Sequence, residues 1–454
     1  MVKKMEELTS FLKTNGFVFQ GSEIYGGLAN SWDYGPLGAQ VKLNLKNLWW
    51  DFFVRSNPHN VGLDSSILLN NKVWKASGHI DGFNDPLVDC KNCQSRWRAD
   101  KLIEEKFPEV NAAKMSNQEL EDFLKTKEIK CPKCGKSDFT PIRNFGLMFK
   151  TQQGVLEDEN SVVYLRPETA QGIFINFKNV QRSLRKKLPF GIGQMGKAFR
   201  NEITPGNFIF RTREFEQMEL EFFFAPDDQT DWFTYWTQMV KKFLVEVLQL
   251  DEHNFRFRAH DQIELAHYST QTVDVEFEFP FGWGELWGIA DRGNFDLTQH
   301  MQSSGDDLTY LDPTTNQKII PHVIEPSVGL ERLMLAIFCQ FYVIEELKDG
   351  SSREVLKLPQ ILAPYLVSVM PLQKNLAQPA QKIYADLLAS GVSATYDETG
   401  NVGKRYRRQD AIGTPFVITY DYDSETDQKV TLRERDTMEQ TRVKITDLVD
   451  YLKR

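Results

Sequence analysis

The sequence contains no long apolar run and few cysteines, and both absences exclude whole classes of protein. No stretch of its 454 residues approaches the roughly eighteen apolar residues that a membrane-spanning helix needs. The charged beginning, Met1–Glu7, has no apolar segment behind it and does not resemble a secretory signal. Five cysteines are too few for a disulfide scaffold in a chain of this length. We therefore expect a cytoplasmic protein that has no contact with a membrane.

An excess of positive charge is also missing. With 54 lysines and arginines against 63 aspartates and glutamates, the formal net charge is −9, which excludes a protein that coats nucleic acid through its overall charge. A local basic surface stays possible, because recognition of nucleic acid depends on where the charge is placed. The length exceeds what one hydrophobic core supports, so two or three domains are expected.

A phosphate-binding loop of the Walker A type is absent from the sequence. Residues 191–196 have the spacing Gly-x-Gly-x-x-Gly, but such a match alone is weak. The segment after it, Lys197–Arg200, predicts a further strand where a dinucleotide-binding fingerprint needs a helix. If the chain binds ATP, it must do so in another way.

Changes of composition divide the chain into four segments. Residues 90–149 hold two Cys-x-x-Cys pairs and a charged middle, so we interpret them as an insertion between residues 1–89 and 150–355, which form a larger domain. Apolar periodicity predicts a helix over Ala39–Val54. Residues 356–454 begin near two prolines and show a β-α-β-β pattern, which predicts a separate small α/β domain.

Alternating polarity predicts strands of an antiparallel sheet in the third segment. Between Phe210 and Phe224 one face of the predicted strand carries Arg213, Phe215, Gln217, Glu219 and Glu221. Burying such a face without partners would be costly, so we interpret it as the wall of a polar site. Residues 274–281 alternate in the same way. An antiparallel sheet with helices on one side places the fold in the α+β class.

Three separated segments carry arginines, and the first of them ends in an aromatic residue, Phe215. They are Phe199–Phe215, Gly284–Arg292 and Gly329–Arg332, the last opening an apolar helix. When a carboxylate attacks the α-phosphate of ATP, fixed guanidinium groups stabilise the developing negative charge, and an aromatic ring can stack on adenine. A single arginine would more often be structural. The ordered set is similar to motifs 2 and 3 of class II aminoacyl-tRNA synthetases.

Further peptides resemble the glycyl-tRNA synthetases in their homodimeric form, over nearly the whole chain. These peptides are Tyr34–Gly38, Arg98–Asp100, Leu165–Gly172, Val323–Gly329 and Gly403–Phe416. The resemblance implies a class II antiparallel sheet flanked by helices, a zinc-knuckle insertion and a C-terminal anticodon-binding domain. It also implies glycine, ATP with Mg²⁺ and tRNA(Gly) as the partners of a glycine–tRNA ligase that acts as a homodimer.

The resemblance assigns site residues by matching motif. The ATP-binding and catalytic positions are Arg200, Asn201, Glu202, Phe210, Arg211, Phe215, Glu285, Leu286, Gly329 and Arg332. The glycine-binding positions are Arg98, Glu168, Gln217, Glu219, Arg292, Glu325 and Ser327. Within the first set, Arg200 holds the α-phosphate, Phe215 stacks on adenine and Glu285 helps to hold Mg²⁺. Because glycine has no side chain, carboxylates and a guanidinium must recognise its ammonium and carboxylate. Larger amino acids are refused by lack of room, so no editing domain is expected.

Four cysteines indicate a structural zinc site. Cys90 and Cys93 form one pair, Cys131 and Cys134 form the other, and four thiolates suit a closed tetrahedral ion. The 37 residues between the pairs exceed the usual spacing, so they must loop out. The alternative is two unrelated reduced pairs. Cys339, inside an apolar stretch, is expected to be a packed core thiol.

A basic cluster in the last segment predicts contact with tRNA. It consists of Lys404, Arg405, Arg407 and Arg408 around an aromatic residue. A bare charge run is usually a solvated face, but this one lies in the segment that resembles an anticodon-binding domain.

Two points depart from a simple match. Asn71 stands near the position where the family usually has a proline at the end of its first class-defining strand. The competing functions are a catalytically inactive synthetase-like subunit that binds nucleic acid or assists a polymerase, and a class II enzyme for another amino acid. The retained motif arginines and glycine-pocket acids favour the glycine enzyme over both.

Overall fold

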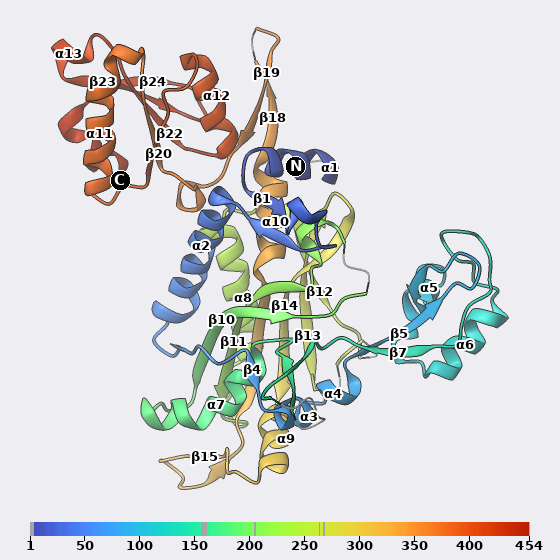
Figure 1. Ribbon diagram of the computed structural model, residues 1–454. Coiled ribbons are helices and arrows are strands. Elements are labelled where there is room, and N and C mark those ends of the chain that lie inside the picture. Colours follow the sequence, from blue (N-terminus) through green and yellow to red (C-terminus); the bar gives the residue numbers. More distant parts are fainter. Residues whose placement is uncertain are drawn as a thin grey trace.

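The computed structural model describes residues 4–155, 161–203, 206–262, 264–266, 268–347 and 349–453. Within these ranges, no helix is both long and apolar enough to span a bilayer. The molecule has a central sheet with helices, a projecting unit and a C-terminal unit (Figure 1).

The central sheet has seven strands, and it confirms the α+β class. Their order is β12 (Phe255–Ala259), β13 (Gln271–Phe279), β14 (Gly282–Gly293), β17 (His322–Gly329), β11 (Glu214–Phe224), β10 (Phe190–Phe199) and β3 (Val61–Gly62). All neighbours are antiparallel except β3 and β10. Both alternating segments became strands, β11 and β13. The Gly-x-Gly-x-x-Gly segment lies inside β10, so it opens no helix.

Helices cover one face of this sheet because alternate residues of its strands are apolar. The main apolar core lies between the strands and α1 (Met5–Thr14), α2 (Pro36–Trp50), α8 (Trp232–Lys242) and α10 (Leu330–Phe341). The helix expected over Ala39–Val54 is α2 continued by a π-helical turn, Asp51–Arg55. Gly329 directly precedes α10, as the third motif predicts. A second apolar cluster packs α7 (Ala170–Ser183) and α9 (Phe295–Ser304) near β10.

The projecting unit contains the cysteine pairs (Figure 1). Its elements are β5 (Asn84–Asp89), β6 (Arg96–Arg98), α5 (Ala99–Glu104), α6 (Asn117–Thr126) and β7 (Arg143–Gly146). Ser116 precedes α6 in a capping box: its hydroxyl accepts from the backbone N–H of Glu119, and the Glu119 carboxylate accepts from the backbone N–H of Ser116. The unit has an apolar core of its own, which includes Val88, Leu102 and Leu120.

The C-terminal unit also has its own core, and the expected strands and first helix are present. The expected β-α-β-β pattern missed a second helix, Val402–Ile412, which lies between the second and third strands. Its sheet order is β21 (Ala394–Tyr396), β20 (Val367–Pro371), β22 (Phe416–Tyr420), β23 (Lys429–Glu434) and β24 (Gln440–Lys444). Its helices are α11 (Ala377–Ala389), α12 (Val402–Ile412), α13 (Ser424–Asp427) and α14 (Leu448–Leu452).

Short elements connect these units. They are β1 (Val18–Gln20), β2 (Trp32–Tyr34), β4 (Leu68–Leu69), α3 (Asn71–Ala76), α4 (His79–Gly82), β8 (Lys150–Gln152), β9 (Val162–Leu165), β15 (Tyr310–Leu311), β16 (Lys318–Ile319), β18 (Tyr342–Glu346) and β19 (Ser352–Leu356). Asn71 is the first residue of α3, and its side-chain amide donates to the backbone carbonyl of Val162 at the start of β9. The asparagine thus ties two short elements together by a bond that proline could not make.

Candidate active site

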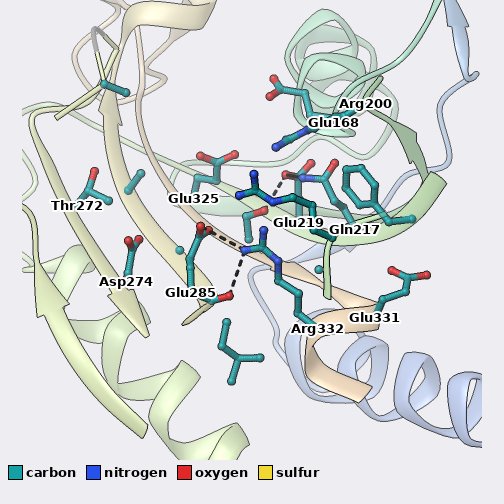
Figure 2. A pocket seen from close by; sticks show the side chains of 18 of the residues that line it. Glu168, Arg200, Gln217, Glu219, Thr272, Asp274, Glu285, Glu325, Glu331 and Arg332 are labelled. Carbon is teal, nitrogen blue, oxygen red and sulfur yellow. Dashed lines mark hydrogen bonds and ion pairs between the residues drawn. The ribbon is translucent and has the colours of Figure 1, made fainter. Parts of the chain in front are cut away.

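A cavity of about 350 Å³ lies on the polar face of the central sheet. Alternation along β11 explains its place: Met218 and Leu220 pack into the core, while Gln217 and Glu219, on the opposite face of the strand, line the cavity (Figure 2). Nine of the ten expected ATP-binding residues line it: Glu202, Arg200, Phe210, Arg211, Phe215, Glu285, Leu286, Gly329 and Arg332. Six of the seven expected glycine-binding residues do so too: Glu168, Gln217, Glu219, Arg292, Glu325 and Ser327.

Two expected site residues, both in the described part of the chain, lie outside the cavity. Asn201 follows β10, and its backbone N–H donates to the carbonyl of Leu147 at 2.7 Å. Arg98 belongs to the projecting unit, where its guanidinium pairs with Asp85 at 3.0 Å and with Asp100 at 2.5 Å. Both carboxylates bind this guanidinium, and Arg98 is not among the residues that line the cavity.

One end of the cavity is rich in arginine. Arg332 at the start of α10 is held by Glu285, with its Nη1 3.0 Å from the backbone carbonyl and 3.2 Å from the carboxylate (Figure 2). Arg200, just after β10, donates to the carbonyl of Pro167 at 3.0 Å and lies 5.4 Å from the ring centre of Phe215. Arg211 lies 3.7 Å from Glu202. The attraction of Arg332 lowers the pKa of Glu285, so this carboxylate is ionised and can bind a cation.

The other end is rich in carboxylates, and Glu219 is the most firmly held. One of its oxygens accepts from the backbone N–H of Thr169 at 2.9 Å. The other accepts from Ser327 at 2.7 Å and from Gln217 at 2.8 Å. Four bonds, counting the Thr169 hydroxyl, therefore fix this side chain in one orientation.

The pKa values of the three carboxyls at this end are shifted in different directions. Burial raises the pKa of Glu325 to about 7, although Arg292 opposes the shift. Burial, together with the charge of Glu168, also raises the pKa of Glu219. Burial acts on Glu168 in the same direction, but His79 at 3.2 Å and Arg292 outweigh it and hold its pKa far below the usual range. The end as a whole attracts a cation such as an ammonium group.

Arg292 lies within the wall of the cavity and binds two carboxylates of the protein. Its Nε and Nη2 donate to both oxygens of Asp296, at 2.7 and 2.8 Å, and its Nη1 donates to Glu325 at 2.8 Å. The guanidinium also stacks 4.0 Å from the ring centre of Tyr268. The Arg292 side chain is buried, with 4% of the residue exposed. Its main role in this geometry is to orient Glu325.

Sequence reasoning did not assign several residues that the fold brings to the site. Asp274 and His260 line the cavity, joined at 2.7 Å. The alternation of residues 274–281 was the available signal for Asp274. Glu331 lines it as well and reaches Lys42 of α2 at 2.8 Å, while Lys42 lies 2.8 Å from Glu216. No local pattern marks these pairs, because their members come from distant parts of the chain.

The four paired cysteines come together in the projecting unit. Cys90 and Cys134 have their sulfurs 3.5 Å apart, Cys93 and Cys131 have theirs 3.7 Å apart, and all four lie within 4.8 Å of one another. Zinc–sulfur bonds of about 2.3 Å in a tetrahedron require sulfurs about 3.8 Å apart. The pairs therefore form one cluster with the geometry of a closed zinc site. Cys339 is buried in the main core, as expected.

The basic cluster of the C-terminal unit lies on α12 and divides into exposed and buried members. Lys404 is exposed, and the Arg407 side chain is 43% exposed. Arg408 is partly exposed and pairs with Asp397 at 2.6 Å. Arg405 is buried and donates to the backbone carbonyls of residues 371, 372 and 397. Contrary to expectation, Arg405 therefore stabilises the fold and has no surface to offer RNA.

Comparisons with known proteins agree with this arrangement. The family model of the tRNA synthetase class II core domain (G, H, P, S and T) matches residues 149–341, and that of the anticodon binding domain matches residues 366–454. A glycine–tRNA ligase of Mesoplasma florum is 68% identical over 449 residues, which cover 99% of each chain. One from Mycoplasma capricolum is 66% identical over 100% of this chain and 99% of its own. One from Caldanaerobacter subterraneus is 58% identical over 99% of this chain and 97% of its own.

Identity at this level extends along almost the whole of each relative, and the motif residues meet in one cavity. The chain belongs to the glycine–tRNA ligase family of class II aminoacyl-tRNA synthetases and is an ATP-dependent aminoacyl-tRNA ligase.

Proposed function

We propose that the cavity on the central sheet is where this chain joins glycine to ATP and then transfers it to tRNA(Gly). The observation that carries this proposal is the polarity of the cavity, with arginines at one end and carboxylates at the other. ATP is an anion and the amino group of glycine is a cation. The two ends therefore bring the glycine carboxylate and the α-phosphate together between them.

At the arginine end, the proposal gives each group a task. Arg200 stabilises the charge that develops on the α-phosphate, and Arg211 and Arg332 bind the outer phosphates. Phe215 stacks on adenine. Glu285, whose carboxylate is ionised, helps to hold the Mg²⁺ that accompanies ATP, because carboxylate oxygens suit this cation.

At the carboxylate end, Glu168, Glu219 and Glu325 surround the ammonium group of glycine. Ser327, which donates to Glu219, shares this wall and leaves its hydroxyl next to the substrate. Arg292 acts through Glu325, which it orients at 2.8 Å. A wall lined so closely by charged groups leaves no apolar space for a side chain, which excludes larger amino acids.

The partners follow from the other two units. We propose that Lys404, Arg407 and Arg408 on α12 contact the phosphates of tRNA, because they are the cluster's exposed or partly exposed members. The Cys90, Cys93, Cys131 and Cys134 cluster binds one structural Zn²⁺. The chain acts as a homodimer in the cytoplasm.

The test is ATP–pyrophosphate exchange with each of the twenty amino acids, followed by charging of tRNA. We expect exchange with glycine alone and transfer to tRNA(Gly). An inactive accessory subunit would show no exchange with any amino acid, and a synthetase of other specificity would respond to a different one. Either result refutes the proposal.

A further inference from the structure

The first turn of α7 places a glutamine between two carboxylates at the glycine end of the cavity. The side-chain nitrogen of Gln171 lies 3.0 Å from Oε1 of Glu168 and 3.0 Å from Oδ1 of Asp296. Gln171 is fully buried, and Asp296 is 2% exposed. The amide of Gln171 therefore joins a residue before α7 to a residue of α9, and Asp296 is 125 positions from Gln171 in the chain.

The orientation of this amide follows from its neighbours. Both carboxylates are acceptors, so the NH₂ group must face them. The amide oxygen lies 2.8 Å from Nε2 of His300, one turn further along α9 than Asp296. Burial lowers the pKa of His300, so its ring is neutral and donates its single N–H to this oxygen. His300 thereby prevents the amide from turning its oxygen toward the acids.

The chain of bonds continues on both sides of the glutamine. Glu168 meets His79 with its second oxygen at 3.2 Å. Asp296 binds Arg292, which in turn binds Glu325. Gln171 is thus the link between Glu168 and Glu325, two carboxylates that are distant in the sequence and line the same end of the cavity.

We propose that Gln171 is a positioning residue for glycine, which sets the distance between Glu168 and the Arg292–Glu325 pair. This inference rests on the proposed function, because it takes the ammonium group of glycine as what the two carboxylates bind. Without the amide, Glu168 and Asp296 would face each other with no donor between them, and repulsion would move them apart. The arginines at the ATP end are bound by other groups, so they should stay in place.

The experiment compares Gln171→Met with Gln181→Met. Methionine keeps the length of the side chain and removes all three hydrogen bonds of the amide. Gln181 is on the same helix, and its amide donates to the backbone carbonyl of Lys186 at 3.2 Å, away from both carboxylates. Hydrogen bonds to charged groups typically contribute more than those between neutral groups. We therefore expect the Michaelis constant for glycine to rise roughly tenfold or more in Gln171→Met. The constant for ATP should stay within about twofold, and Gln181→Met should behave like the wild type.

A second variant keeps the test decisive if Gln171→Met folds poorly. His300→Phe leaves the glutamine in place but frees its amide to rotate, so it should raise the glycine constant alone, and by less. Equal changes for glycine and ATP in both variants, or an unchanged glycine constant, would show that the glutamine only supports the fold. Failure of the proposed function would be visible separately, as absence of glycine-dependent exchange in the wild type.

Discussion

We expect the charge of Glu325 to be important for the binding of glycine. Glu325→Gln keeps the size of the side chain and an acceptor for Arg292, but removes one negative charge from the glycine end. A hydrogen bond to a charged group contributes roughly 1.5–3 kcal/mol, so glycine-dependent exchange should lose about ten- to a hundredfold in kcat/KM. The Michaelis constant for ATP should change little.

The matched control is Glu278→Gln, on the same sheet but exposed. It should exchange like the wild type. If Glu325→Gln weakened glycine and ATP equally and lowered the melting temperature, Glu325 would be a structural residue and not a glycine ligand.

The same carboxyl predicts a pH dependence. Because burial raises the pKa of Glu325 to about 7, the group is ionised above pH 7 and protonated below it. Glycine keeps its ammonium charge throughout this range, so its affinity should fall as the pH falls. Well below this pKa, the ionised fraction of Glu325 falls about tenfold for each pH unit. The Michaelis constant for glycine should therefore rise by nearly tenfold per pH unit. Measurement between pH 6 and 8 tests this, and Glu325→Gln should abolish the slope.

At the level of elements, the projecting unit should depend on metal. Its core is small, so a tetrahedral ion shared by four thiolates would supply much of its stability. Purified protein should contain one zinc per chain, and a chelator should release it with loss of the near-ultraviolet signal of Trp97, which packs against that core. Cys134→Ser should lose the metal, while Cys339→Ala, outside the cluster, should keep it.

If carefully desalted protein contained no zinc and four thiols reacted under native conditions, the zinc hypothesis would be refuted. The cysteines would then be two reduced pairs that bind no metal. The structure already shows that the pairs lie together, which the spacing of 37 residues alone did not establish.

At the scale of the whole molecule, Asp410 joins the C-terminal unit to the rest of the chain. This carboxylate on α12 is fully buried and accepts from Arg353 of β19 at 2.9 Å and from Arg433 of β23 at 2.7 Å. The hairpin of β18 and β19 begins directly after α10, the helix that carries Arg332 (Figure 1). The helix expected to contact tRNA is therefore held to the hairpin that follows the catalytic helix.

Asp410→Asn should loosen this connection and affect the two reactions unequally. Breaking a buried charge pair costs about 3–5 kcal/mol, so the melting temperature should fall and tRNA charging should lose roughly tenfold or more in kcat/KM. Glycine activation, which needs no tRNA, should stay within about twofold. Asp386→Asn, which removes an exposed pair with Lys382, is the control. Equal losses in activation and charging would contradict the connecting role.

Local pattern was sufficient for much of this protein. Alternation along β11 and β13 and the periodicity of α2 were visible in the sequence, because side chains on one face of a strand or helix recur at fixed spacing. The order of the motifs was enough to predict the family and most of the residues that line the cavity. Residues that act in one reaction must come together in the fold, whatever the length of the chain between them. Glu221 marks the limit of pattern: it shares the face of Glu219, yet it is fully buried and does not line the cavity.

Only the tertiary structure decided which charged groups face substrate and which face the protein. In sequence, Arg98 and Arg405 looked like ligands of glycine and RNA, but carboxylates and carbonyls elsewhere in the fold bind them first. Gln171 lies within a peptide that resembles the family, Leu165–Gly172, but sequence reasoning assigned it no role, because its contacts depend on Asp296, brought beside it by the packing of α7 against α9. The sequence therefore determined which elements form and what chemistry they carry. The tertiary structure decided how charges are paired, because hydrogen bonds between distant residues exist only once the chain is folded.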